Sequence, residues 1–159
     1  MVPVTLDKRY PLQYIFCKTL RVIGRDDNLF KLSAMVWIYQ LCADVNKKTI
    51  STFVKIRISN SNINIEKGRY LNTPAEDRIC KLCNSGVEDE FHFTTICSKL
   101  QSCREEFFKD ICDVVPSFIN MSDFDKFKFI FSCNDLDICK MCILGVNKLY
   151  SLNQSKKQD

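Results

Sequence analysis

Three cysteines and the single histidine of the chain form a compact pattern near the middle of the sequence. Cys80 and Cys83, followed by His92 and Cys97, have the spacing C-x2-C-x8-H-x4-C. A C-x2-C pair directs two thiolates inward from one tight turn, and the later histidine and cysteine can complete a tetrahedron. Four such ligands saturate Zn²⁺ and leave no position for water. This arrangement is typical of structural zinc sites, whereas catalytic sites keep one position open. The spacing therefore predicts one closed zinc site.

Other interpretations of this pattern remain open from the residues alone. The four side chains could be ordinary reduced cysteines and a surface histidine, or the C-x2-C pair could be a thiol redox centre. The redox interpretation is weak, because no strand-then-helix pattern surrounds the pair. A second pair, Cys139 and Cys142, lies in an apolar helical run. We interpret this pair as core residues, although Cys112 and Cys133 could complete a Cys-only metal site with it.

Ten cysteines in 159 residues would suit the disulfide scaffold of a secreted protein. The first 22 residues mix charged and apolar side chains, however, and contain no apolar signal-peptide core. No apolar run approaches the roughly 20 residues that a membrane span needs. We therefore expect reduced cysteines in an intracellular protein of the cytoplasm or nucleus, with no membrane partner. The net charge of +4 is too small to indicate nucleic acid by itself.

Apolar residues recur at three- and four-residue spacing over much of the chain, which predicts a mainly α-helical, small domain organised around the zinc knuckle. We expect an N-terminal helical segment at 1–48, a basic segment with the knuckle at 49–100, C-terminal helices at 101–151 and a frayed polar tail at 152–159. Asp26 and Asp27 are suited to cap a long helix in the first segment. Residues 47–49 are expected to be a break, and residues 53–58 fit a helix or a strand.

Polar residues indicate where the later helices begin. An irregular stretch is expected at 60–64 and a turn at Gly68. Thr73 and Ser98 each precede a glutamate or glutamine by three residues, which predicts two capping boxes. Ser122 with Asp125 predicts a third helix start, and the last helix is expected over about 136–150.

The residues around the knuckle resemble a known segment. Residues 55–69 read KIRISNSNINIEKGR, residues 74–83 read PAEDRICKLC, and residues 88–93 read EDEFHF ahead of Cys97. This stretch resembles the cysteine/histidine tail of LINE-type (non-LTR) retrotransposon reverse transcriptases, several of which carry a C-x2–3-C-x7–8-H-x4-C knuckle. The resemblance is clearest over about 53–100, is looser as far as Tyr150, and does not extend to 1–45. It implies a module that assists the binding of RNA or single-stranded DNA.

The basic segment contains the residues predicted to contact nucleic acid. Eight basic side chains and three acidic ones lie between residues 47 and 81, a local charge of +5 that can contact phosphates. The predicted contacts are Lys55, Arg57, Lys67, Arg69, Arg78 and Lys81. Tyr70 and Phe91 could stack on bases, but Phe91 and Phe93 fit better as core of the knuckle. The acidic run at 88–90 is expected to solvate the loop, with Glu90 placed to support His92.

Catalytic chemistry is not expected. A reverse transcriptase needs paired aspartates at a strand turn to hold two metal ions, and the adjacent Asp26 and Asp27 have no apolar strand context. The remaining length is also too short for a polymerase or an endonuclease. The spacing predicts a non-catalytic zinc-binding module, and the resemblance implies that it derives from a retrotransposon reverse transcriptase. The alternative is a zinc-stapled structural or protein-interaction module that binds no nucleic acid.

Overall fold

The computed structural model describes residues 44–132 and 135–155. Its α-helices are α3 (Lys47–Arg57), α4 (Asn64–Tyr70), α5 (Gln101–Val114), α6 (Asp123–Ser132) and α7 (Leu136–Ser155). Short helical turns are η2 (Ala75–Asp77), η3 (His92–Ile96), η4 (Ser98–Leu100) and η5 (Pro116–Asn120). The described residues contain no β-strand, only one antiparallel bridge between Ile79 and Val87. The predicted mainly α-helical class is confirmed, whereas the helix expected after Asp26 and Asp27 lies outside the described residues.

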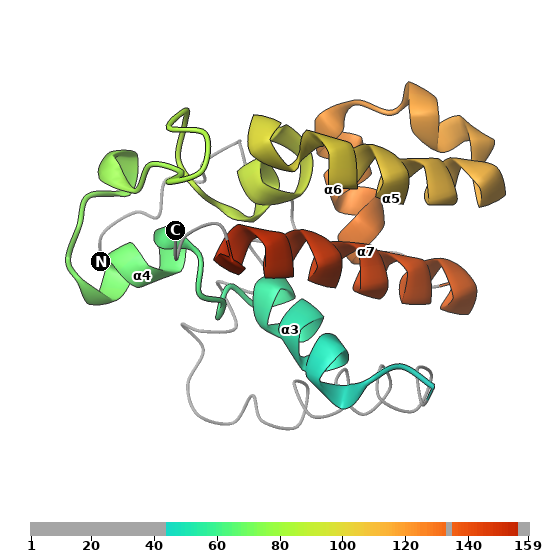
Figure 1. The fold of residues 1–159 in the computed structure, drawn as a ribbon, viewed down its shortest axis with the longest axis horizontal. Helices are drawn as coiled ribbons and strands as arrows, with labels where there is room; N and C mark the ends of the chain where they lie inside the picture. Colours follow the sequence, from blue (N-terminus) through green and yellow to red (C-terminus); the bar gives the residue numbers. More distant parts are fainter. Residues whose placement is uncertain (1–43, 133–134, 156–159) are drawn as a thin grey trace, which may run out of the picture.

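Helix α7 is at the centre of the described domain. It packs against α3 on one side and against α5 and α6 on the other (Figure 1). The buried apolar residues form one cluster, whose members include Ile50, Phe53, Cys80, Phe93, Cys97, Leu100, Phe107, Ile111, Phe118, Ile130, Phe131, Cys142, Ile143 and Leu149. Phe53 of α3 stacks on Phe131 of α6, with the ring centroids 5.3 Å apart. Since two cysteines of the knuckle belong to this cluster, the knuckle shares the core of the helices.

Helix α3 begins earlier than its sequence indicates. The Oδ1 atom of Asn46 accepts the N–H of Lys48 at 2.8 Å, which satisfies a donor that the first turn of a helix leaves unpaired. The break expected at 47–49 is therefore wrong. The ambiguity over 53–58 is resolved as helix as far as Arg57. Phe53 and Ile56 are both buried, and a three-residue spacing places two side chains on one face of a helix but on opposite faces of a strand.

Gly68 lies inside helix α4 and not in the turn expected there. The glycine is buried, and a Cβ atom at this position would overlap the side chain of Arg78. The guanidinium of Arg78 donates to the backbone carbonyl of Ile65 at 2.7 Å and to that of Thr73 at 2.9 Å from Nε. A glycine within a helix costs about 1 kcal/mol relative to alanine, but here it makes room for an arginine that ties α4 to the knuckle.

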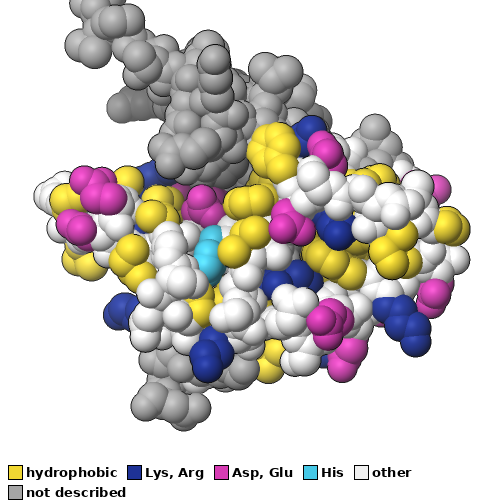
Figure 2. All heavy atoms as spheres, turned by 90° about the horizontal axis from the view of Figure 1, so that it is seen from above, with side chains coloured by type: hydrophobic (Ala, Val, Ile, Leu, Met, Phe, Trp, Pro, Cys, Tyr) yellow, Lys and Arg dark blue, Asp and Glu magenta, His cyan; other side chains and the backbone are white. Residues whose placement is uncertain are grey.

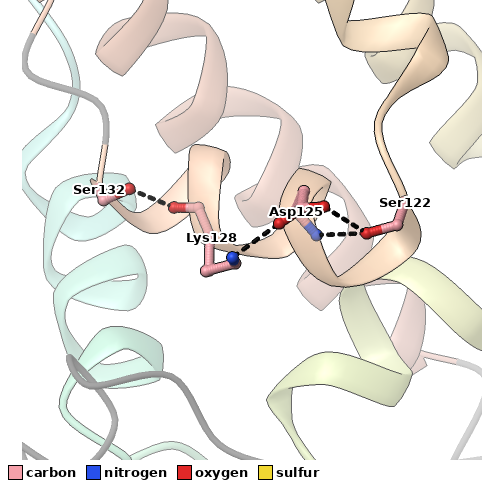
Figure 3. A network of polar contacts seen from close by, with 4 residues as sticks. All are labelled: Ser122, Asp125, Lys128 and Ser132. Carbon is pink, nitrogen blue, oxygen red and sulfur yellow. Dashed lines mark hydrogen bonds and ion pairs between the residues drawn. The ribbon is translucent and has the colours of Figure 1, made fainter.

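One of the three predicted helix starts has the expected cap. At the start of α6, the Ser122 Oγ atom accepts the N–H of Asp125 at 3.1 Å and donates to its carboxylate at 2.6 Å (Figure 3). Lys128, one turn later, pairs with the same carboxylate at 2.6 Å. The capping boxes expected at Thr73 and Ser98 are wrong. The 3₁₀ turns η2 and η4 occupy these places, and neither turn has a side-chain cap.

Helix α7 extends as far as Ser155, so the tail predicted from residue 152 is helical over its first four residues. Asn153 is fully buried, and its Nδ2 atom donates to the carboxylate of Glu88 at 2.9 Å. This contact explains the difference, because it gives the polar end of α7 a buried partner beside the knuckle. None of the helices in the described part of the chain has both the length and the apolar character needed to cross a membrane.

Candidate metal centre

The C-x2-C pair lies at the tip of a tight hairpin. The backbone N–H of Cys80 donates to the carbonyl of Gly86 at 3.0 Å, and the N–H of Asn84 donates to the carbonyl of Cys80 at 2.9 Å. Gly86 has a φ of +71°, a conformation that favours glycine. A Cβ atom on Gly86 would be 3.6 Å from Nδ1 of His92. The turn thus places the backbone of Gly86 directly beside the imidazole.

The other two ligand residues lie at the two ends of a π-helical turn. The N–H of Cys97 donates to the carbonyl of His92 at 2.8 Å, which closes a wider ring than in an α-helix. In an α-helix a residue five positions on would be rotated by about 140°, so the wider turn keeps both side chains on one side. Asp89 lies just before the turn, and its Oδ1 atom accepts the N–H of His92 at 2.7 Å. Turns of this kind are frequent at functional sites.

These two segments bring the four predicted ligands together. The Sγ atoms of Cys80 and Cys97 are 3.8 Å apart, and Sγ of Cys83 is 3.2 Å from Nε2 of His92. All four ligand atoms lie within 4.8 Å of one another. In a tetrahedral zinc site, two sulfurs are about 3.8 Å apart, and a sulfur is about 3.6 Å from the nitrogen. The residues therefore fit a single metal ion bound by three cysteines and one histidine.

The ligand atoms differ in how they are exposed. Cys80 and Cys97 have no exposed surface and His92 has 6%, whereas Cys83 is half-buried at the edge of the site. Burial raises the pKa of Cys80 to about 12 and also raises the pKa of Cys97. Burial lowers the pKa of His92, which favours the neutral imidazole that a metal ion needs. With raised pKa values, these two thiols keep their protons near neutral pH. Binding of a metal ion would displace the protons, because a cysteine binds metal as the thiolate.

Cys83 has a different environment from the other two cysteines. Burial acts to raise its pKa, but hydrogen bonds from Ser85 and the neighbouring thiols lower it overall. The Ser85 hydroxyl donates to Sγ of Cys83 at 3.2 Å. The site has four protein donors and is closed on its inner side by the core. Such a centre can hold protein segments together but offers no open coordination position for a substrate.

The acidic run beside the ligands does not have the role expected from the sequence. Glu88 and Glu90 are 0% and 2% exposed, so the prediction that they solvate the loop is wrong. Glu88 binds three segments: its backbone carbonyl accepts the N–H of Ile65, its N–H donates to the carbonyl of Arg78, and its carboxylate accepts from Asn153. The carboxylate is buried because it connects the hairpin to the end of α7.

The six basic residues predicted to contact nucleic acid have different surroundings. Lys55 and Lys81 are exposed, while Arg57 and Lys67 are half-buried. Arg69 forms an ion pair of 2.9 Å with the buried carboxylate of Glu66, and Arg78 binds backbone carbonyls as described above. On the face seen in Figure 2, basic side chains lie apart from one another among acidic and apolar ones. Contact of these residues with nucleic acid stays a prediction.

The aromatic residues of the segment divide into core and surface. Phe93 is fully buried, and its ring meets that of Tyr150 edge-on at 6.2 Å. Phe91 packs edge-on against Phe127 at 5.6 Å. The interpretation of Phe91 and Phe93 as core residues is therefore confirmed. Tyr70, in contrast, is 77% exposed at the end of α4.

The second pair of cysteines is part of the core. Cys139 and Cys142 are 8% and 0% exposed and belong to the main apolar cluster, which confirms their interpretation as core residues. Cys133 lies outside the described residues. Within the part of the chain that the structure describes, Cys80, Cys83, His92 and Cys97 are the only group identified with the proximity that a metal ion requires.

Sequence reasoning missed Arg104 as a residue of this site. Arg104 is 3% exposed, and its guanidinium donates to the carbonyl of Cys97 at 2.7 Å and to that of Thr94 at 2.9 Å. The apolar spacing gave a signal for its burial. Arg104 is four residues after Leu100, three before Phe107 and seven before Ile111, so it lies on the same buried helical face as these residues. A charged residue in such a stripe must have internal partners.

Comparisons of the chain with protein-family models, with curated proteins and with solved structures found no match.

Proposed function

We propose that this domain is a non-catalytic module in which one Zn²⁺ joins the hairpin to the π-helical turn. The observation that supports this proposal is the approach of four ligand atoms to within 4.8 Å of one another, from residues 80, 83, 92 and 97. Three sulfurs and one imidazole nitrogen are ligands that zinc prefers. Two of the cysteines are also fully buried core residues, so the ion would hold together segments on which the core depends.

Metal analysis tests this proposal. Protein purified without chelator is expected to contain one zinc ion per chain, and Cys97→Ser is expected to lose it because the site then has three ligands. Cys112→Ser is the matched control, since Cys112 is half-buried and lies outside the cluster. Protein without metal would contradict the proposal, and two ions per chain would contradict a single site.

A second role, in binding RNA or single-stranded DNA, is favoured by the end of helix α4. Tyr70 is 77% exposed there, directly after Lys67 and Arg69 on the same helix. An exposed ring beside basic side chains can stack on a base while the cations contact phosphates. This role would agree with descent from the non-catalytic tail of a retrotransposon reverse transcriptase. It would also agree with a location inside the cell, where cysteine ligands remain reduced.

Fluorescence anisotropy with labelled single-stranded RNA at two salt concentrations tests the second role. Tyr70→Ala is expected to weaken binding by about 1–3 kcal/mol, because it removes one stacking platform. Lys67→Gln is expected to reduce the slope of log K against log salt by about 0.7, as for the loss of one phosphate contact. Lys109→Gln on the exposed face of α5 is the control for charge alone. If the parent protein does not bind at low salt, the domain has the structural role only.

A further inference from the structure

Arg104 is a buried cation whose hydrogen-bond acceptors are neutral. Its Nε and Nη2 atoms donate to the carbonyls of Thr94 and Cys97, and Nη1 donates to the side-chain oxygen of Gln101 at 2.7 Å. None of the ion pairs found among the described residues includes this arginine. An arginine stays charged in proteins, and a buried charge without a compensating one is strongly unfavourable.

The metal centre would supply the missing negative charge. Zn²⁺ with three thiolates and one neutral imidazole has a net charge of −1, whereas three thiols and the same imidazole have none. We propose that Arg104 is the positioning residue of this centre: it holds the carbonyl of Cys97 and compensates the negative charge of the three-thiolate zinc site. This inference rests on the zinc site proposed above and gives the buried arginine a function there.

The electrostatics of the site agree with this assignment. Burial lowers the pKa of Arg104, and among the groups that act to raise it Cys97 has the largest effect, ahead of Asp123 and Cys103. Asp123 is exposed, so water screens its attraction. Cys97, in contrast, is fully buried and belongs to the candidate metal centre.

The geometry gives Arg104 a second effect, on the position of Cys97. The carbonyls of Thr94 and Cys97 are at the end of η3, and that of Cys97 also accepts the backbone N–H of Leu100 at 3.2 Å. Two donors from one rigid guanidinium fix both carbonyls, and with them the backbone that carries the fourth ligand. Groups that orient metal ligands in this way typically change metal affinity by about 10- to 100-fold when they are removed.

The test is the zinc affinity of the full chain, measured by competition with a chromophoric chelator. Arg104→Gln keeps hydrogen-bond donors but removes the charge, and it is expected to weaken zinc binding by about 10- to 100-fold. Arg104→Lys keeps the charge and is expected to recover most of that loss. Lys109→Gln removes one positive charge from the exposed face of α5 and is expected to leave the affinity close to that of the parent. Unchanged affinity in Arg104→Gln would overturn the proposal.

A change of ligand separates charge compensation from a packing role. Cys83→His makes a site of two cysteines and two histidines, whose net charge with Zn²⁺ is zero. In that background, Arg104→Gln is expected to weaken zinc binding much less than in the parent. An equal loss in both backgrounds, or a lysine variant no better than the glutamine variant, would overturn the charge role. If the parent binds no zinc, the zinc site itself fails. If the parent binds zinc and Arg104→Gln has no effect, only the role of Arg104 fails.

Discussion

Replacing His92 with alanine is expected to abolish stable zinc binding and to unfold the knuckle over residues 79–100. Structural zinc contributes about 10–16 kcal/mol of binding free energy in small zinc-dependent folds, which is comparable to the whole stability of an ordinary domain. His92 is 6% exposed, and its backbone is part of the π-helical turn that also presents Cys97. Loss of this ligand would therefore release the proposed zinc ion and leave a cavity where the imidazole packs.

Hydrogen–deuterium exchange measures this effect segment by segment. In His92→Ala, amides of residues 79–100 are expected to exchange far faster, together with those of the last turn of α7, because Glu88 of the knuckle binds Asn153 there. His92→Cys is the matched control: it supplies a fourth thiolate and should retain zinc and protection. Unchanged protection and zinc content in His92→Ala would show that His92 is not a ligand.

Replacing Gly145 with valine is expected to destabilise the domain by about 3 kcal/mol, at the upper end of the usual cost of overpacking. Gly145 is buried where α7 packs against α5, and any Cβ at this position would overlap the ring of Phe107. The ring cannot move away easily, because Phe107 is itself 4% exposed and packs within the core. Valine adds a branched, rigid side chain at the point where the two helices approach most closely.

Urea unfolding of the zinc-loaded protein measures this loss. Leu144→Val on the exposed side of the same helix controls for the lower helix propensity of valine and is expected to cost less than about 1 kcal/mol. Combining Gly145→Val with Phe107→Leu should recover part of the stability, because the smaller side chain makes room. If Gly145→Val and Leu144→Val unfold at the same urea concentration, α5 and α7 do not have the close contact described here.

Much of the secondary structure could be predicted from local patterns. The apolar spacing indicated the helices α5, α6 and α7, and the Ser122–Asp125 pair indicated the cap of α6. The secondary-structure predictions were wrong where contacts with distant residues determine the local structure. Gly68 lies inside a helix because Arg78 packs against it, and Thr73 makes no cap, its carbonyl instead accepting from the same arginine.

The sequence by itself determined the four candidate ligands, because the spacing of cysteine and histidine limits which side chains two short turns can bring together. Only the tertiary structure decided what surrounds them. Glu88 lies in an acidic run that looks like solvated surface in the sequence, but it is buried, and its carboxylate accepts from Asn153. Asn153 is 65 residues from Glu88, and no local pattern can report such a contact.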